Sequence, residues 1–342
     1  MTTSAEPSPP ARHARAAAED GDRLSGEQAP GRLPDFFLVG HSKSGTTALY
    51  EMLRRHPRIF MPDLKEPVFF AQELPRQAHR YEAPATLEEY TSLFAPAEPG
   101  QLTGEASASY LWSRTAAERI ARAQPDARII AILREPASFL RSLHLQCVQS
   151  HYETEKDLRR ALDLEESRRE GRNIPPRSLW PQVLLYSEHV RYVEQLRRYH
   201  ERFAPEQVLV LIYDDFRSEN EATVRRVLRF LDVDDAGPVE TVEANPTLAM
   251  RSQRLDELVH AVSVGAGPAS RAAKAALKAL MPQRIRRPAL KAVQRRFVVA
   301  EPEEPDADLM LELRHRFRGE VLALSEYLDR DLITLWGYDS VA

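Results

Sequence analysis

Apolar and polar positions along the chain predict buried strands that alternate with amphipathic helices. Continuous apolar runs, typical of strands covered on both faces, lie at 36–40, 127–135 and 207–216. Segments with helical spacing follow these runs at about 45–55, 136–150 and 219–233. Shorter elements are expected between them, with strands at 58–61 and 101–107 and helices at 85–94, 113–123 and 187–200. This order predicts an α/β fold in which helices flank a central parallel sheet.

The folded part should be a single domain of the phosphate-loop (P-loop) type over residues 34–342, because no internal repeat or second boundary interrupts the alternation. Residues 1–33 consist of Pro, Ala, Ser, Gly and charged residues without periodicity, which is typical of a disordered tail. No stretch approaches the roughly 20 apolar residues of a membrane span, and the N-terminus has no signal-like apolar run. A cytoplasmic protein is therefore expected.

Composition narrows the function classes. A net charge of −4 argues against general nucleic-acid binding, which usually requires a basic domain. The single cysteine, Cys147, excludes a disulfide framework and any cysteine-based zinc site.

The first strand runs into the loop "GHSKSGTTAL", residues 40–49. In a parallel sheet ligands bind beyond the carboxyl ends of the strands, so the helix start and the Thr46 and Thr47 hydroxyls would face an anion there. Lys43 precedes Gly45 by two places, whereas a nucleoside-triphosphate loop places its lysine directly after the last glycine. The loop predicts phosphate binding without naming a reaction. The alternative is a tight turn before a capped helix.

A second strand ends at Arg134, directly before a helix that Pro136 can begin. An arginine at that edge favours a second anionic group over a metal ion. A kinase using ATP and magnesium remains an alternative, since "YDDF" at 213–216 offers acids at another strand end. A non-catalytic nucleotide-binding module is a third possibility.

Three stretches, "GHSKSGTTALYEMLRRHPRI", "KEPVFFAQE" and "ILREPASFLRSLHLQ", together resemble sulfotransferases that use 3′-phosphoadenosine 5′-phosphosulfate (PAPS). The likeness is closest to the carbohydrate branch, including the heparan-sulfate enzymes, and extends roughly over 34–250 and 306–338. It implies in-line transfer of a sulfuryl group to a hydroxyl or amine of a carbohydrate or small-metabolite acceptor. Adenosine 3′,5′-bisphosphate is then the second product, and no metal ion is required.

The resemblance also implies roles for individual residues. Lys43 would contact the sulfate and the bridging oxygen, where negative charge develops during transfer. Further donor-binding residues implied in this way are Ser42, Ser44, Gly45, Thr46 and Thr47 for the 5′-phosphosulfate, and Arg134 and Ser142 for the 3′-phosphate. The alternatives without a ligand-binding role are a surface salt bridge for Arg134 and a solvent-facing helix hydroxyl for Ser142.

Glu66 matches the general base proposed for the carbohydrate branch of the family. A carboxylate can take that role if burial among apolar groups, here residues 68–70, raises its pKa. The alternative is a surface glutamate next to Lys65. His41, inside the loop, is a competing base, since other branches use a histidine.

"GEASASY" at 104–110 matches the segment that faces the acceptor, which implies that Glu105 and Ser107 face the substrate. Heparan-modifying members often carry a lysine after this glutamate, and here Ala106 stands there, which favours a less charged acceptor. Glu105 would orient Lys43 or the acceptor, or else pair with an arginine of the fold.

One segment, 268–297, holds nine Lys and Arg residues and no acid. Such a run is most often a solvated helix face. The alternatives are a cap over the anionic donor and acceptor, or a surface helix in weak contact with anionic lipid.

Overall fold

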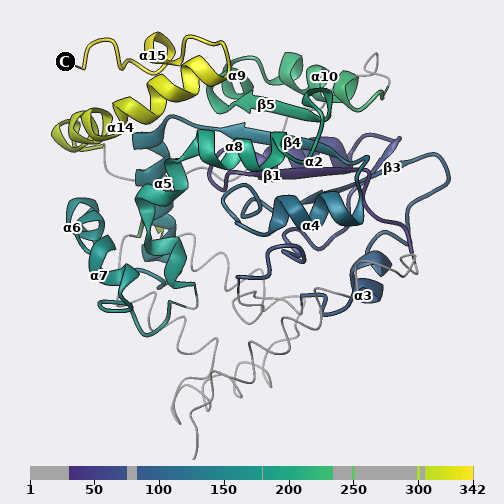
Figure 1. Ribbon diagram of the computed structural model, residues 1–342, viewed down its shortest axis with the longest axis horizontal. Helices are drawn as coiled ribbons and strands as arrows, with labels where there is room; N and C mark the ends of the chain where they lie inside the picture. The colour runs from purple at the N-terminus through teal and green to yellow at the C-terminus, as the bar shows by residue number, and fades with distance from the viewer. Residues whose placement is uncertain are drawn as a thin grey trace, which may run out of the picture.

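A five-stranded parallel sheet forms the centre of the protein (Figure 1). The computed structural model describes residues 31–74, 83–178, 180–233, 249–250, 299–300 and 305–341. The strands of the sheet are β1 (Phe36–Gly40), β2 (Ile59–Phe60), β3 (Leu102–Ala106), β4 (Arg128–Leu133) and β5 (Val208–Ile212). Their order is β2-β3-β1-β4-β5, and every neighbouring pair is parallel. A separate antiparallel pair joins β6 (Ala249–Met250) to β7 (Val299–Ala300).

Helices cover both faces of the sheet. They are α2 (Thr46–Arg54), α3 (Leu87–Ser92), α4 (Ala116–Ala123), α5 (Pro136–Gln149), α6 (Leu158–Asp163), α7 (Glu165–Arg169), α8 (Tyr192–His200), α9 (Tyr213–Ser218), α10 (Asn220–Phe230), α14 (Ala307–Tyr327) and α15 (Leu332–Leu335). Three 3₁₀ turns accompany them: η3 (Pro181–Leu184), η4 (Tyr186–Val190) and η5 (Pro205–Gln207). The predicted α/β fold with a flanked parallel sheet is confirmed.

Side-chain alternation along β1 explains the two layers. Phe36 and Leu38 enter one apolar cluster with α2 and α10, whereas Phe37 and Val39 enter the other with α4, α5, α8 and α14. Successive side chains of a strand point to opposite faces, so a continuous apolar run suits a strand that is covered on both sides.

Two predicted elements differ in extent from the observed ones. The strand expected at 207–216 ends at Ile212, and Tyr213 begins α9 with two aspartates in its first turn, where helices favour acids. The helix expected at 187–200 is divided into η4 and α8, because the backbone of Arg191 (φ −75°, ψ 59°) is not helical.

Two predicted segments cannot be compared with the structure. The tail 1–33 falls outside the described residues up to position 30, and the basic segment 268–297 lies outside them entirely. Across the residues that are described, no helix is long and apolar enough to cross a membrane.

A buried ion pair joins the segment after α5 to α7. Arg168 and Glu153 lie 2.9 Å apart, with 1% and 0% of their side chains exposed. The guanidinium also donates to the carbonyl of Ala161, and the Tyr186 hydroxyl donates to Glu153 at 3.0 Å. These bonds satisfy both charges inside the layer formed by α6, α7 and η4.

Replacing Arg168 by alanine should lower the free energy of unfolding by about 3–5 kcal/mol, because it leaves the Glu153 carboxylate buried without its counter-charge. Urea denaturation measures this loss. The nearby Arg172, whose side chain is 66% exposed and pairs with the exposed Glu170, provides the matched control. Arg172→Ala should cost less than about 1 kcal/mol. Equal losses in the two variants would contradict the assignment of the pair as a buried anchor.

Candidate functional site

The loop between β1 and α2, residues 41–45, curls tightly around the start of α2. Gly45 has φ 86°, and a Cβ atom there would lie 3.0 Å from the Phe216 ring, so both conformation and packing require glycine. Gly45 gives α2 no side-chain cap, which leaves the first N–H groups of the helix available to an anion. The half-buried residues around this turn are Ser42, Lys43, Gly45 and Thr47, and the buried ones are Ser44 and Thr46.

Two cations meet at this loop from adjacent strands. Arg134, directly after β4, donates from Nη1 to the backbone carbonyl of Lys43 at 2.9 Å, and its guanidinium lies 4.9 Å from the centre of the Tyr213 ring. Burial lowers the pKa of the Lys43 ammonium, and the positive charge of the nearby Arg134 lowers it further. Within the described part of the chain neither cation has an acidic partner. Their mutual repulsion is relieved when a multiply charged anion binds between them.

Sequence reasoning singled out Ser142 but not its neighbour Arg141. Burial lowers the pKa of Arg141, and the positive charge of the nearby Arg134 lowers it further. Arg141 is therefore a third cation at this end of α5, close to Arg134. The only sequence signal was its place two helical turns after Arg134. Ser142 is 2% exposed, which excludes a solvent-facing hydroxyl.

The start of α5 is fixed by Glu135. Its carboxylate accepts hydrogen bonds from the backbone N–H groups of Ala137 (3.1 Å) and Ser138 (2.6 Å), and Pro136 occupies the first helical position. The Tyr338 hydroxyl, near the C-terminus, donates to the same carboxylate at 2.8 Å. Glu135 is therefore a helix cap that the C-terminal segment holds in place.

The acids of 213–216 are also engaged by the C-terminal segment. Arg330 donates two bonds of 2.6 Å to Asp215, and the Trp336 indole donates to Asp214 at 2.9 Å. Figure 1 shows α14 and α15, in yellow, beside α9. The carboxylates that a kinase site would use for magnesium thus serve to dock α15 onto α9.

Glu66 lies in an irregular segment between β2 and α3. Its side chain is 39% exposed and pairs with Lys65 at 2.5 Å, while its backbone N–H donates to the carbonyl of Ala106 at 2.9 Å. The expected burial of this carboxylate among residues 68–70 is therefore wrong: those three side chains are buried, but Glu66 turns toward Lys65.

Glu105 and Ser107, expected to face the acceptor, are both 0% exposed. Glu105 accepts hydrogen bonds from the hydroxyls of Tyr90 (2.7 Å) and Tyr110 (3.0 Å). Burial raises the pKa of Glu105 to about 7; the hydroxyls of Ser107, Tyr90 and Tyr110 oppose the shift and the Glu66 charge adds to it. Ser107 Oγ accepts from the backbone N–H of Val68 at 3.1 Å. The observed partners of both side chains are protein groups.

His41 is fully buried, and its ring contacts the core layer of α5 and α8. Its Nε2 lies 2.7 Å from the side-chain oxygen of Gln195, and its ring centre lies 5.0 Å from that of Phe139 and 6.2 Å from that of His189. The Gln195 amide nitrogen donates to the carbonyls of Glu188 and His189, so its oxygen accepts and His41 carries its proton on Nε2. The ring anchors the loop to α8.

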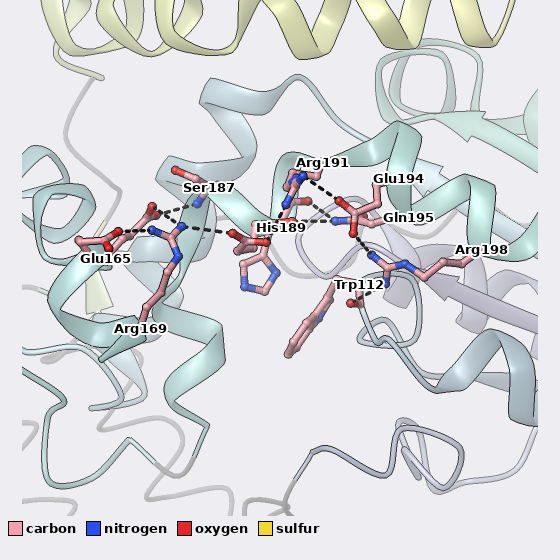
Figure 2. A network of polar contacts seen from close by, with 11 residues as sticks. Trp112, Glu165, Arg169, Ser187, His189, Arg191, Glu194, Gln195 and Arg198 are labelled. Carbon is pink, nitrogen blue, oxygen red and sulfur yellow. Dashed lines mark hydrogen bonds and ion pairs between the residues drawn. The ribbon is translucent and has the colours of Figure 1, made fainter. Parts of the chain in front are cut away.

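Figure 2 shows the polar contacts around Gln195 and its neighbours. Gln195 and Arg198 extend from α8, and the Arg198 guanidinium donates to the carbonyl of Trp112 at 3.1 Å. The Trp112 ring packs against His189, with ring centres 4.8 Å apart. Burial lowers the pKa of His41 to about 3, with the nearby His189 contributing, and burial lowers the pKa of His189 to about 4.

Acid should destabilise the protein through this histidine pair. Both rings stay neutral in the fold, whereas the unfolded chain protonates them below pH 6.5, so their contribution is full above that pH and falls as the pH drops toward 4. At pH 5 each ring should account for a loss of about 2 kcal/mol relative to pH 7.5. Urea denaturation at the two pH values measures the difference.

His189→Gln should shrink this pH difference by about 2 kcal/mol, whatever its effect on baseline stability. His315, which is exposed on α14, gives the control: His315→Gln should leave the difference unchanged. An undiminished difference in His189→Gln would contradict the neutral buried pair.

Comparisons with known proteins cover most of the described core. A family model described as "Sulfotransferase family" matches residues 34–237, more than half of the chain. Mouse carbohydrate sulfotransferase 15 is 27% identical over 247 residues, covering 59% of this chain and 44% of the relative. Mouse bifunctional heparan sulfate N-deacetylase/N-sulfotransferase 4 is 29% identical over 218 residues, covering 62% and 24%. The chain thus spans less than half the length of either relative.

A solved structure extends the likeness to the whole fold. The crystal structure of a sulfotransferase from Alicyclobacillus acidocaldarius superposes with a TM-score of 0.64 at 25% sequence identity. The match covers 89% of this chain and 99% of that one.

Proposed function

The chain belongs to the sulfotransferase family of transferases, and from this premise we propose that it moves a sulfuryl group from PAPS to an acceptor hydroxyl or amine. The observation that carries the choice of donor is the pair of cations at the phosphate loop. Lys43 and Arg134 approach each other without an acidic partner among the described residues, beside the uncapped start of α2. A donor with phosphate groups at both ends of a ribose matches this distribution of charge.

The donor's two ends would lie on different elements. The 5′-phosphosulfate would occupy the loop, against the N–H groups at the start of α2 and the hydroxyls of Thr46 and Thr47. The 3′-phosphate would lie near Arg134 and Ser142, with Arg141 adding positive charge at the same end of α5. Parallel pairing of β1 with β4 supports this, because it brings the two loops to one edge of the sheet.

The reaction needs two groups from this chain. An acceptor oxygen or nitrogen forms a bond to sulfur as the bond from sulfur to the 5′-phosphate oxygen breaks, and the Lys43 ammonium stabilises the charge that grows on that oxygen. The acceptor proton passes to Glu66, a role proposed from its match to the base of the carbohydrate branch and not from burial. Lys65 holds Glu66 by an ion pair, so the acceptor must displace or share that contact.

The proposed acceptor class rests on the names of the relatives and on Ala106, where this chain differs from heparan-modifying members. The relatives named above carry carbohydrate and heparan sulfate in their names, which favours a carbohydrate or a small hydroxylated metabolite. Ala106, which is buried, gives the end of β3 no cation for a polyanionic glycan. A weakly charged acceptor fits best, and screening fractionated metabolites with labelled PAPS would identify it.

Ligand-dependent thermal stabilisation tests the donor assignment without an acceptor. Adenosine 3′,5′-bisphosphate should raise the melting temperature, corresponding to about 2.7 kcal/mol at a hundred times its dissociation constant. ATP with magnesium should give a smaller shift, and EDTA should not weaken the response to the bisphosphate. No shift with the bisphosphate, or a larger one with ATP and magnesium, would overturn the proposal in favour of a kinase.

A further inference from the structure

The segment from Glu66 to Phe70, here called the strap, holds a strained backbone. Glu66 has φ 64° and Val68 has φ 53°, both in the left-handed region. For a β-branched residue such as Val68 this conformation is a genuine outlier, and it persists only where surrounding contacts impose it. Surrounding contacts must therefore hold the strap in this conformation beside the proposed general base.

Three backbone N–H groups of the strap donate hydrogen bonds to residues 106–110, at the end of β3 and directly after it. The Glu66 N–H donates to the Ala106 carbonyl at 2.9 Å, and the Val68 N–H donates to Ser107 Oγ at 3.1 Å. The Phe70 N–H donates to the Tyr110 hydroxyl oxygen at 3.1 Å. The last bond is the only one of these three that relies on the end of a long side chain.

Glu105 fixes that end. The Tyr110 hydroxyl donates its single proton to Glu105 Oε2 at 3.0 Å, which leaves an oxygen lone pair for the Phe70 N–H. Tyr90 donates to the same carboxylate oxygen at 2.7 Å, and its ring stacks on Phe69 with centres 4.5 Å apart. Glu105, Tyr90 and Tyr110 are all 0% exposed, so water does not compete for these hydrogen bonds.

The chemistry at this point is unusually costly for a purely structural position. Glu105 is 0% exposed, and burial of an ionised carboxylate is costly even when it accepts hydrogen bonds. An apolar side chain would fill the same space without that penalty. A carboxylate kept here in spite of that cost points to a role for its bonds to the two hydroxyls.

We propose that Glu105 is a positioning residue: through Tyr110 it locks the strap in its strained form and so sets the place of the Glu66 carboxylate. The role of Glu66 as base rests on the proposed function, whereas the hold of Glu105 on the strap does not. Glu105 then acts from inside the protein and makes no contact with the acceptor.

Hydrogen–deuterium exchange of the strap amides tests the mechanical link. Tyr110→Phe and Glu105→Leu should speed exchange of the peptide covering 66–70 about tenfold, with the β4 amides unchanged. Tyr90→Phe is the matched control, because it removes a hydroxyl from the same carboxylate oxygen but none from a strap N–H; its effect should be much smaller. Unchanged exchange in Tyr110→Phe overturns the proposal, and this mild variant suffices if Glu105→Leu fails to fold.

Turnover of labelled PAPS with an accepting fraction tests the consequence for Glu66. Glu105→Leu should lower turnover about a hundredfold and leave the dissociation constant of adenosine 3′,5′-bisphosphate within about twofold. Glu105→Gln, whose amide oxygen can accept both hydroxyls, should recover about tenfold of that loss. Equal losses in the two variants would mean that the carboxylate acts on the acceptor directly, which overturns the positioning role.

Failure of the donor assignment looks different. If faster exchange in Tyr110→Phe accompanies a wild-type protein that does not bind the bisphosphate, the strap mechanism stands and the proposed function falls. If the bisphosphate binds and the strap exchanges normally in every variant, the function stands and the inference falls.

Discussion

Lys43→Ala should lower turnover of PAPS about a thousandfold, the largest effect expected of any single substitution in the loop. A preorganised cation that meets developing charge on a leaving oxygen typically contributes two to three orders of magnitude, roughly what one oxyanion-hole donor supplies. The side chain is placed by its left-handed backbone (φ 62°) and by the bond from Arg134 to its carbonyl. Rapid-quench measurement of labelled sulfate transfer gives the rate.

The loss should not come from unfolding. The fold disfavours the Lys43 ammonium through burial and through Arg134, so its removal should leave the melting temperature unchanged or slightly higher. Lys156, exposed before α6, is a control whose alanine variant should match wild-type turnover. Loss of activity together with a lower melting temperature would indicate a structural lysine instead.

Glu66→Gln should lower turnover about a hundredfold or more, since general-base catalysis contributes two to four orders of magnitude. Glutamine keeps the shape and the backbone bond to Ala106, and loses the exposed pair with Lys65, which is worth less than about 1 kcal/mol. The dissociation constant of adenosine 3′,5′-bisphosphate should stay within about twofold of wild type, because the donor site proposed above does not include Glu66.

The measurement combines steady-state turnover with calorimetric titration of the bisphosphate. Glu88, exposed on α3, supplies the matched control, and Glu88→Gln should behave as wild type. A large loss of bisphosphate affinity in Glu66→Gln would place Glu66 in the donor site or in the architecture of the loop. A normal turnover would return the role of base to another group.

The arrangement proposed for the donor site could be predicted from the sequence. Apolar runs identified β1 and β4, and the rule that parallel strands end at one edge was enough to bring Lys43 and Arg134 together. Pro136 likewise marked the first turn of α5 correctly. These features depend on local pattern, which a single sequence contains.

The features that were missed depend on partners far away in the chain. The place of the His41 ring is set by Gln195, 154 residues later, and Asp215 is drawn into α9 by Arg330, 115 residues later. Glu105 was expected to face a substrate because "GEASASY" resembles the acceptor-facing segment of the family. Since β3 is buried on both faces, alternation along the strand could not tell an inward carboxylate from an outward one and so could not correct that expectation.

The contacts made by residues 330–338 have a consequence for biosynthesis. Arg330 bonds across 115 residues, Trp336 across 122 and Tyr338 across 203, and they hold α9 and the first turn of α5, the elements that border the phosphate loop. A ribosome delivers β1 to β5 long before these side chains emerge. The proposed donor site therefore matures only after residues 330–338 have left the ribosome, and a nascent chain halted before Arg330 should hold its sheet but bind the bisphosphate poorly.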